Sequence, residues 1–205
     1  LCEPLTRLGA EVTGIDTSKK AIRTARAHSK LGNLKIKYLN TDFLNFKSSQ
    51  KYDVITAMEV LEHVEDLNLV INNIKKNLNK NGIFIGSTIN KTLSSYIFAI
   101  WIAENIMKLV PKKTHNWKDF IKPNNLKKKL ILNNFKNINF QGVIYNPLSN
   151  DWKMIDNCGV NYMFSAKILT LILHRHIPIL KYLANLFLTY RFLLLLPYFH
   201  RLRLY

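Results

Sequence analysis

Apolar positions along the first ninety residues follow two patterns that alternate with each other. Short apolar or alternating runs predict strands at residues 10–16, 34–43, 52–58 and 83–89. Apolar residues at helical spacing predict helices at residues 18–32 and 64–78. Ser18 is a suitable N-cap for the first helix, and Gly32 is suited to end it. This alternation predicts an α/β fold with an open, mostly parallel sheet.

The pattern changes in the second half of the chain. A largely apolar helix is expected from residue 93 to about 110, and a basic helix from 126 to 135. Residues 138–146 and 160–167 have the composition of strands, and the Asn-Pro pair at 146–147 indicates a turn after the first of them. We therefore expect a C-terminal antiparallel strand pair that closes one edge of the sheet.

Several residues suited to ligand binding come directly after predicted strands. Asp16 ends the first strand, Asp42 and Phe43 end the second, and Met58 ends the third. In open α/β sheets, ligands bind beyond the carboxyl ends of the strands. A carboxylate at such a position can accept hydrogen bonds from both hydroxyls of a ribose. Asp16 is equally compatible with an ordinary turn acid, and Met58 with a core methionine.

The stretch AMEVLEHVED, residues 57–66, carries the candidate chemistry. Glu59, Glu62 and His63 are spaced i, i+3 and i+4, which places them on one face if the stretch is helical. His63 could take a proton from a substrate hydroxyl, or the three side chains could hold a divalent ion. Alternatively, the two glutamates complement a helix N-terminus and His63 is half-buried. Glu65 and Asp66 are expected to be solvated helix residues.

Composition narrows the classes of partner. The 205-residue chain has a formal net charge of +17, which raises nucleic acid or an anionic membrane as partners. Its lysines are scattered, and the pattern of a basic face with an aromatic platform for bases is not visible, so nucleic acid is disfavoured. The two cysteines, Cys2 and Cys158, are too few for a disulfide framework and favour a reducing compartment.

Several motifs together resemble a known family. The segments VTGID, YDVITAMEVLEHVEDL and NGIFIGSTIN resemble class I S-adenosylmethionine-dependent methyltransferases. The more specific segments LVPKKTHNWKDFIKP, YNPLSNDWKM and VNYMFSAK are similar to the O-methyltransferases of ubiquinone biosynthesis. The resemblance covers about residues 1–167. It implies a Rossmann-like fold and S-adenosylmethionine-dependent methylation of a hydroxyl of a polyprenylated catechol and of demethylubiquinol.

The resemblance also implies roles for single residues. Cofactor contacts would come from residues at the strand ends: Asp16, Asp42, Phe43 and Met58. Glu59, Glu62 and His63 would be catalytic and would also be ligands of a magnesium-like ion, although imidazole is an unusual ligand for magnesium. An RNA methyltransferase is the second hypothesis, motivated by the charge.

The implied partners are the prenylated substrate, an anionic membrane surface and other proteins of ubiquinone biosynthesis. A peripheral location on the bacterial inner membrane, cytoplasmic face, or on the mitochondrial inner membrane follows from the substrate. Residues 93–123, which combine aromatic side chains with lysines, are expected to form a lid that meets the membrane.

The ends of the chain carry two further expectations. In the family, a first strand and a glycine-rich loop precede the segment with which this sequence begins, so we expect an N-terminally truncated member in which residues 1–8 complete a helix. Residues 168–205 contain no acidic residue and do not continue the α/β pattern. They are expected to be a membrane-seeking extension or a tail translated after a frame change. An inactive remnant is accordingly the third hypothesis.

Overall fold

The structure is a computed structural model that describes residues 1–96, 117–146 and 151–168. The α-helices are α1 (Cys2–Arg7), α2 (Lys19–Leu31), α3 (Leu67–Asn77), α4 (Leu93–Ser95) and α5 (Pro123–Leu132). The strands are β1 (Thr13–Asp16), β2 (Lys37–Asn40), β3 (Tyr52–Met58), β4 (Leu78–Ile89), β5 (Phe135–Asn146), β6 (Asp151–Ile155) and β7 (Asn161–Ile168). Short 3-10 turns lie at η1 (Phe43–Asn45), η2 (Leu61–His63) and η4 (Trp117–Asp119).

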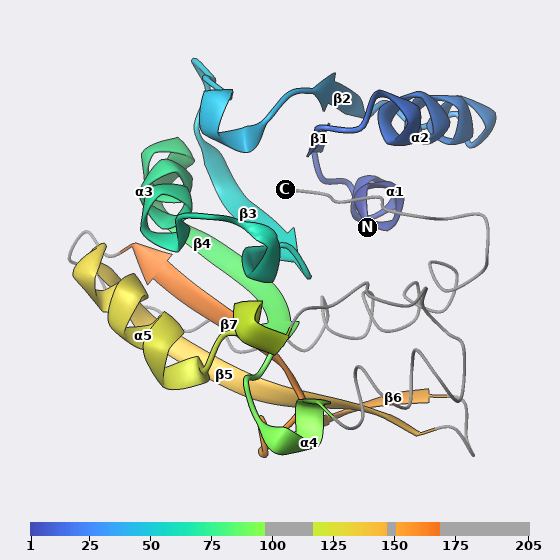
Figure 1. Ribbon diagram of the computed structural model, residues 1–205. Coiled ribbons are helices and arrows are strands. Elements are labelled where there is room, and N and C mark those ends of the chain that lie inside the picture. Colours follow the sequence, from blue (N-terminus) through green and yellow to red (C-terminus); the bar gives the residue numbers. More distant parts are fainter. Residues whose placement is uncertain (97–116, 147–150, 169–205) are drawn as a thin grey trace.

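The strands of the described residues form two sheets (Figure 1). β1 and β2 pair in parallel, and the second sheet has the order β3-β4-β7-β5-β6. In that second sheet β3 and β4 are parallel, whereas the pairs β4–β7, β7–β5 and β5–β6 are antiparallel. The predicted α/β class is confirmed. The predicted C-terminal pair is β5 and β7, and β6, which the sequence pattern did not indicate, forms the outer edge beside β5.

Helix α2 matches its prediction because local chemistry defines both of its ends. The Ser18 side chain accepts a hydrogen bond from the Ala21 backbone N–H at 3.2 Å, and Gly32 is the C-cap residue. Ile22 and Ala25 are buried against Cys2 of α1 and Tyr38 of β2. This small cluster joins α1 and α2 to the β1–β2 sheet.

Helix α3 begins three residues later than predicted. Its N-cap is Asp66, whose Oδ1 accepts from the backbone N–H groups of Asn68 and Leu69 at 2.8 and 3.1 Å. Asp66 is exposed, as expected, but it precedes the helix rather than lying within it, because an aspartate at this position satisfies backbone donors at the helix start. β4 is longer than predicted. It begins at Leu78 and passes through a bulge in which Asn81 has φ 65°.

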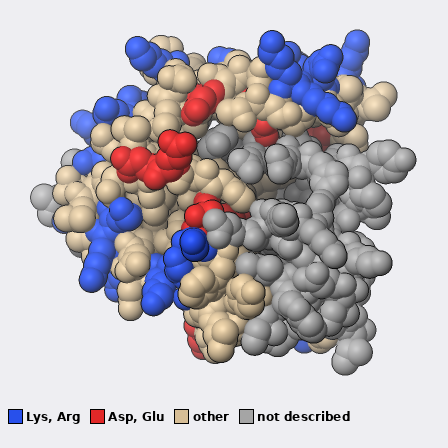
Figure 2. Space-filling view, in the orientation of Figure 1, with Lys and Arg blue, Asp and Glu red and all other residues tan. Residues whose placement is uncertain are grey.

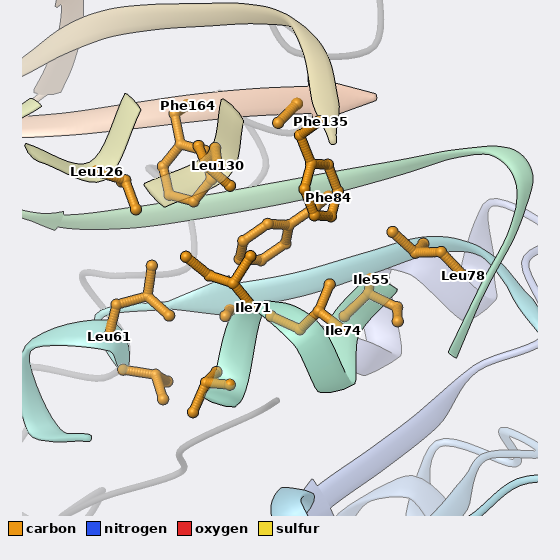
Figure 3. Packing of buried hydrophobic residues seen from close by; sticks show 14 of the residues in the cluster. Ile55, Leu61, Ile71, Ile74, Leu78, Phe84, Leu126, Leu130, Phe135 and Phe164 are labelled. Carbon is orange, nitrogen blue, oxygen red and sulfur yellow. The ribbon is translucent and has the colours of Figure 1, made fainter. Parts of the chain in front are cut away.

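The main hydrophobic core lies between the five-stranded sheet and the helices α3 and α5 (Figure 3). Its aromatic side chains contact one another: Phe84 of β4 meets Phe164 of β7 edge-on at 5.0 Å between ring centroids, and Phe135 at 6.1 Å. Ile15 of β1 belongs to the same cluster. The two sheets therefore share one core.

Two predicted segments lie largely outside the described residues. Of the expected lid at 93–123, the structure describes α4, Tyr96 and the part from residue 117 onward, and of the tail at 168–205 it describes Ile168 alone. Among the helices that are described, none has the length and apolar character needed to span a bilayer. On the face shown in Figure 2, lysine and arginine side chains gather over α2 and α5.

Candidate active site

The candidate site lies at the carboxyl ends of the parallel strands β3 and β4. Met58, the last residue of β3, pairs in register with Ser87 of β4. Met58 is half-buried, and the chain turns directly after it into the predicted catalytic stretch. The register therefore brings the start of the stretch 57–66 next to the hydroxyl residues Ser87 and Thr88.

Glu59 leaves β3 in an uncommon backbone conformation. Its φ is 54°, in the left-handed region that residues other than glycine seldom adopt. Its backbone N–H donates to the carbonyl oxygen of Ser87 at 3.0 Å and to Ser87 Oγ at 3.1 Å. Ser87 Oγ in turn donates to Glu59 Oε1 at 2.8 Å. Ser87 thus forms hydrogen bonds with both the backbone and the carboxylate of Glu59.

Glu62 and His63 lie on the short 3-10 turn η2, and Glu59 lies before it. The prediction that Glu59, Glu62 and His63 share one helix face is therefore wrong. Glu62 is buried, with 4% of its surface exposed, and its Oε2 accepts from Thr88 Oγ1 at 2.7 Å. His63, predicted to be half-buried in the structural alternative, is exposed.

The arrangement bears on the predicted metal site. Within the described residues, no group of three or more histidine, cysteine, aspartate or glutamate side chains is placed so that it could hold a metal ion. The Glu59 carboxylate is bonded to Ser87 and the Glu62 carboxylate to Thr88, and these two residues are consecutive on a strand. The three side chains as arranged do not fit a magnesium-like ion.

Tyr162 shows the electrostatic character of this region. It is fully buried on β7, in register with Thr88, and its hydroxyl donates to the Ile121 carbonyl oxygen at 2.8 Å. Burial raises the pKa of the Tyr162 phenol, and the charges of Glu62, Cys158 and Glu59 raise it further. Burial first, and the nearby negative charges second, therefore favour the protonated form of this phenol.

Asp16 lies at the end of β1, as predicted, and is 2% exposed. Its Oδ1 accepts from the Ser18 backbone N–H at 2.6 Å, and its carbonyl oxygen accepts from the Asn40 side chain at 2.9 Å. The carboxylate is thus held against the start of α2. A buried carboxylate fixed at a strand end suits the hydroxyl donors of a ribose, and this role stays a prediction.

Asp42 and Phe43 have clear local roles. Asp42 is exposed and caps η1, with Oδ1 accepting from the Leu44 N–H at 2.8 Å. The Phe43 ring belongs to the main core, is 4% exposed and stacks on Phe46 at 6.5 Å between centroids. These contacts account for both residues without a ligand, so their cofactor roles stay predictions.

Sequence reasoning did not single out Ser87 and Thr88 as residues of the site. The signal available was a pair of consecutive hydroxyl residues near the end of an apolar, buried strand. Such residues need hydrogen-bond partners when buried. What the sequence could not supply was the partner of each, because both partners lie more than twenty-five residues away, at |i−j| of 28 and 26.

Comparisons with known proteins bear on the chemistry of this site. The family model described as a methyltransferase domain matches residues 2–155. The ubiquinone biosynthesis O-methyltransferase of Pelagibacter ubique is 45% identical over 163 residues, covering 80% of this chain and 68% of that protein. The enzyme of the same name from Bartonella tribocorum is 41% identical over 168 residues, with coverages of 82% and 68%. The chain belongs to the ubiquinone biosynthesis O-methyltransferase family.

Solved structures agree on the fold. The magnesium protoporphyrin IX methyltransferase of Synechocystis, solved with bound S-adenosylhomocysteine, aligns with a TM-score of 0.59 at 21% identity, over 82% of this chain and 68% of that one. The likeness at this identity concerns the fold. Membership of the ubiquinone biosynthesis O-methyltransferases confirms the predicted enzyme class over the RNA methyltransferase alternative.

Proposed function

We propose that this chain transfers the methyl group of S-adenosylmethionine to a hydroxyl of a polyprenylated catechol, and of the later demethylubiquinol, beside the carboxyl ends of β3 and β4. The observation that carries the proposal is the turn after Met58, which presents Glu59 and His63 at the strand ends in a chain of this family. Ligands of open α/β sheets bind at this edge.

Asp16 and Met58 are the residues we assign to the cofactor. The Asp16 carboxylate would accept hydrogen bonds from the ribose hydroxyls, and Met58 would contact the cofactor from the end of β3. Asp42, which is exposed two residues after the end of the neighbouring strand β2, is suited to accept from the adenine amino group. When bound, S-adenosylmethionine supplies an electrophilic methyl group on a positively charged sulfur.

His63 is the residue we assign to the proton. A phenolic hydroxyl is a weak nucleophile until it loses its proton, and an exposed imidazole can accept that proton. The substrate oxygen then forms a bond to the methyl carbon while the carbon–sulfur bond breaks, and the sulfur keeps the electron pair. Glu59, which is half-buried and lies four residues before His63, would orient the substrate hydroxyl. Glu62, buried against Thr88, would support the turn.

The test is methyl transfer from labelled S-adenosylmethionine to a short-chain prenylated catechol. His63→Ala should lower kcat by about 10²–10⁴-fold, the usual contribution of a general base, while calorimetry shows unchanged affinity for S-adenosylhomocysteine. His28→Ala is the matched control, because His28 is also exposed but lies on α2 and pairs with Glu3. Full activity of the His63→Ala protein would overturn the assignment. Loss of wild-type activity on chelation, restored by Mg²⁺, would instead indicate metal ligands.

We also propose that the enzyme meets an anionic membrane surface, peripherally, to reach its prenylated substrate. The described residues that flank the segment 97–116 support this. Leu93 and Tyr96 are 73% and 47% exposed, and Lys91 Nζ lies 5.2 Å from the ring centroid of Trp117. Exposed apolar and aromatic side chains beside lysines favour the headgroup region of a bilayer.

Co-sedimentation with vesicles tests this second proposal. The protein should bind vesicles that contain phosphatidylglycerol severalfold better than vesicles of phosphatidylcholine alone, and Leu93→Ser should weaken that binding. Leu132→Ser is the matched control, since Leu132 is 79% exposed at the end of α5, away from α4. Equal, negligible binding to both kinds of vesicle would contradict the proposal.

A further inference from the structure

Ser87 holds Glu59 through a closed set of hydrogen bonds. The Glu59 backbone N–H is shared between the carbonyl oxygen and the hydroxyl of Ser87, at 3.0 and 3.1 Å. The same hydroxyl donates to Glu59 Oε1 at 2.8 Å. Because one atom of Ser87 contacts both ends of Glu59, the bonds fix the direction of the carboxylate relative to the backbone.

The backbone conformation of Glu59 in this arrangement is energetically unfavourable. A residue with a Cβ in the left-handed region pays about 1–2 kcal/mol, and Glu59 has φ 54°. Such conformations persist where the surrounding structure determines them, and they gather at functional sites. Here the determining residue is Ser87, which is 3% exposed and has little freedom to move.

Ser87 also joins the two sides of the site. In register it stands opposite Met58, which we assign to the cofactor, while its side chain holds Glu59, which we assign to the substrate hydroxyl. A change at Ser87 would therefore alter the placement of the substrate-side carboxylate relative to the cofactor-side methionine. In methyl transfer the oxygen, the carbon and the sulfur must be aligned, so small displacements are expensive.

We propose that Ser87 is a positioning residue for methyl transfer, acting through Glu59. The proposal rests on the function proposed above. Thr88 differs from Ser87, since its hydroxyl donates a hydrogen bond to Glu62 and its side chain is fully buried. The two consecutive hydroxyl residues thus have different tasks: Ser87 orients a carboxylate of the site, and Thr88 supports the buried turn.

A double-mutant cycle tests this assignment. Ser87→Ala should lower kcat by about ten- to a hundredfold, in line with the effect of small misplacements, with little change in the affinity for S-adenosylhomocysteine. When Ser87→Ala is added to Glu59→Gln, kcat should fall by less than about a further twofold, because the effects of residues that act as a unit are not additive. Ser87→Cys keeps the volume but donates weakly, and provides a second variant that should fold if Ser87→Ala does not.

Ser165→Ala is the matched control. Ser165 is a half-buried serine on β7, in register with Ile85 of β4. The Ser165→Ala substitution removes a serine hydroxyl from the same sheet, and it should leave kcat unchanged. Thermal unfolding of each variant reports whether a loss of rate follows a loss of structure.

The outcomes separate the inference from the proposal beneath it. Full activity of Glu59→Gln would remove the role of Glu59 and with it the role of Ser87. A damaged Glu59→Gln protein beside a fully active Ser87→Ala protein would overturn the inference about Ser87 alone. Fully additive losses in the double variant would also overturn it, because Ser87 would then act independently of Glu59.

Discussion

The two faces of β4 differ in what they do with a buried hydroxyl. On the face that packs against α3 and α5, Thr88 follows Phe84 and Gly86 and bonds Glu62 within the main core. On the opposite face, Ser87 lies between Ile85 and Ile89 and donates a hydrogen bond to Glu59, which is only half-buried. Successive strand residues point to opposite faces, so neighbours in sequence reach different environments.

A single strand can therefore contribute both to stability and to the positioning of a carboxylate. Glu59 and Glu62 are three residues apart, yet Glu59 is half-buried and Glu62 is buried in the interior. Removing a partner of a buried carboxylate costs folding free energy. Removing the partner of a half-buried one should mainly cost orientation. Three substitutions test this contrast.

Thr88→Val should destabilise the protein by about 2 kcal/mol, because it removes the hydrogen bond to the buried carboxyl of Glu62 while it preserves the shape of the side chain. Urea denaturation followed by circular dichroism measures the change. Thr56→Val is the matched control, on a half-buried threonine of β3, and should change stability by less than about 1 kcal/mol. Equal effects of the two substitutions would remove the distinction between the two faces.

Tyr162→Phe should destabilise by about 1 kcal/mol near neutral pH, through loss of the bond to the Ile121 carbonyl oxygen. It should also change the response to alkali. The pKa of Tyr162 is raised above its usual value of 10.0, chiefly by burial and next by Glu62. The folded state therefore keeps its proton when the unfolded state loses it, so the stability is complete below about pH 10 and falls as the pH rises further.

Unfolding free energies measured between pH 8 and 11 test that linkage. The decline above pH 10 should be smaller in Tyr162→Phe than in the unaltered protein. Cys2, whose pKa burial raises to about 11, contributes its own decline in both proteins and cancels in the difference. Identical slopes would mean that Tyr162 titrates as freely in the folded chain as in the unfolded one.

Glu59→Gly should be more stable than Glu59→Ala by about 1 kcal/mol, although glycine is usually the less stable of the two. Both variants lack the carboxylate, and they differ in the cost of holding φ at 54°. Thermal unfolding of the pair measures the difference. At Glu65, which is not among the residues of positive φ, glycine should show no such advantage. A more stable alanine at 59 would mean that the turn relaxes when Ser87 loses its carboxylate partner.

The parts of the fold that the sequence predicted well are those determined locally. The helix α2 was predicted to within a residue because Ser18 and Gly32 are capping residues in the chain itself. The strand β3 was predicted at both ends by its apolar run. Asp16 and Met58 were placed correctly at strand ends, because that placement depends only on where a strand stops.

The parts that failed depend on contacts far away along the chain. A spacing of i, i+3 and i+4 does not distinguish a helix from a left-handed residue followed by a 3-10 turn. The bonds from Ser87 and Thr88 decide between them at the turn of residues 59–63. Strand β6 was missed because residues 151–155 mix charged and apolar side chains and are ordered by pairing with β5.

The place of β7 has a consequence for the order in which the molecule can be assembled. β7 is the last described strand in the sequence but lies between β4 and β5 in the sheet. As the chain emerges from the ribosome, the second edge of β4 therefore stays unpaired until residues 161–168 have been synthesised. Until then Thr88 also lacks its pairing neighbour Tyr162. Unpaired strand edges attract other chains. The growing protein thus passes through a stage, some seventy residues of synthesis long by the interval from Ile89 to Asn161. During this stage the strand whose hydroxyls will hold the carboxylates of Glu59 and Glu62 is open to association with a neighbour.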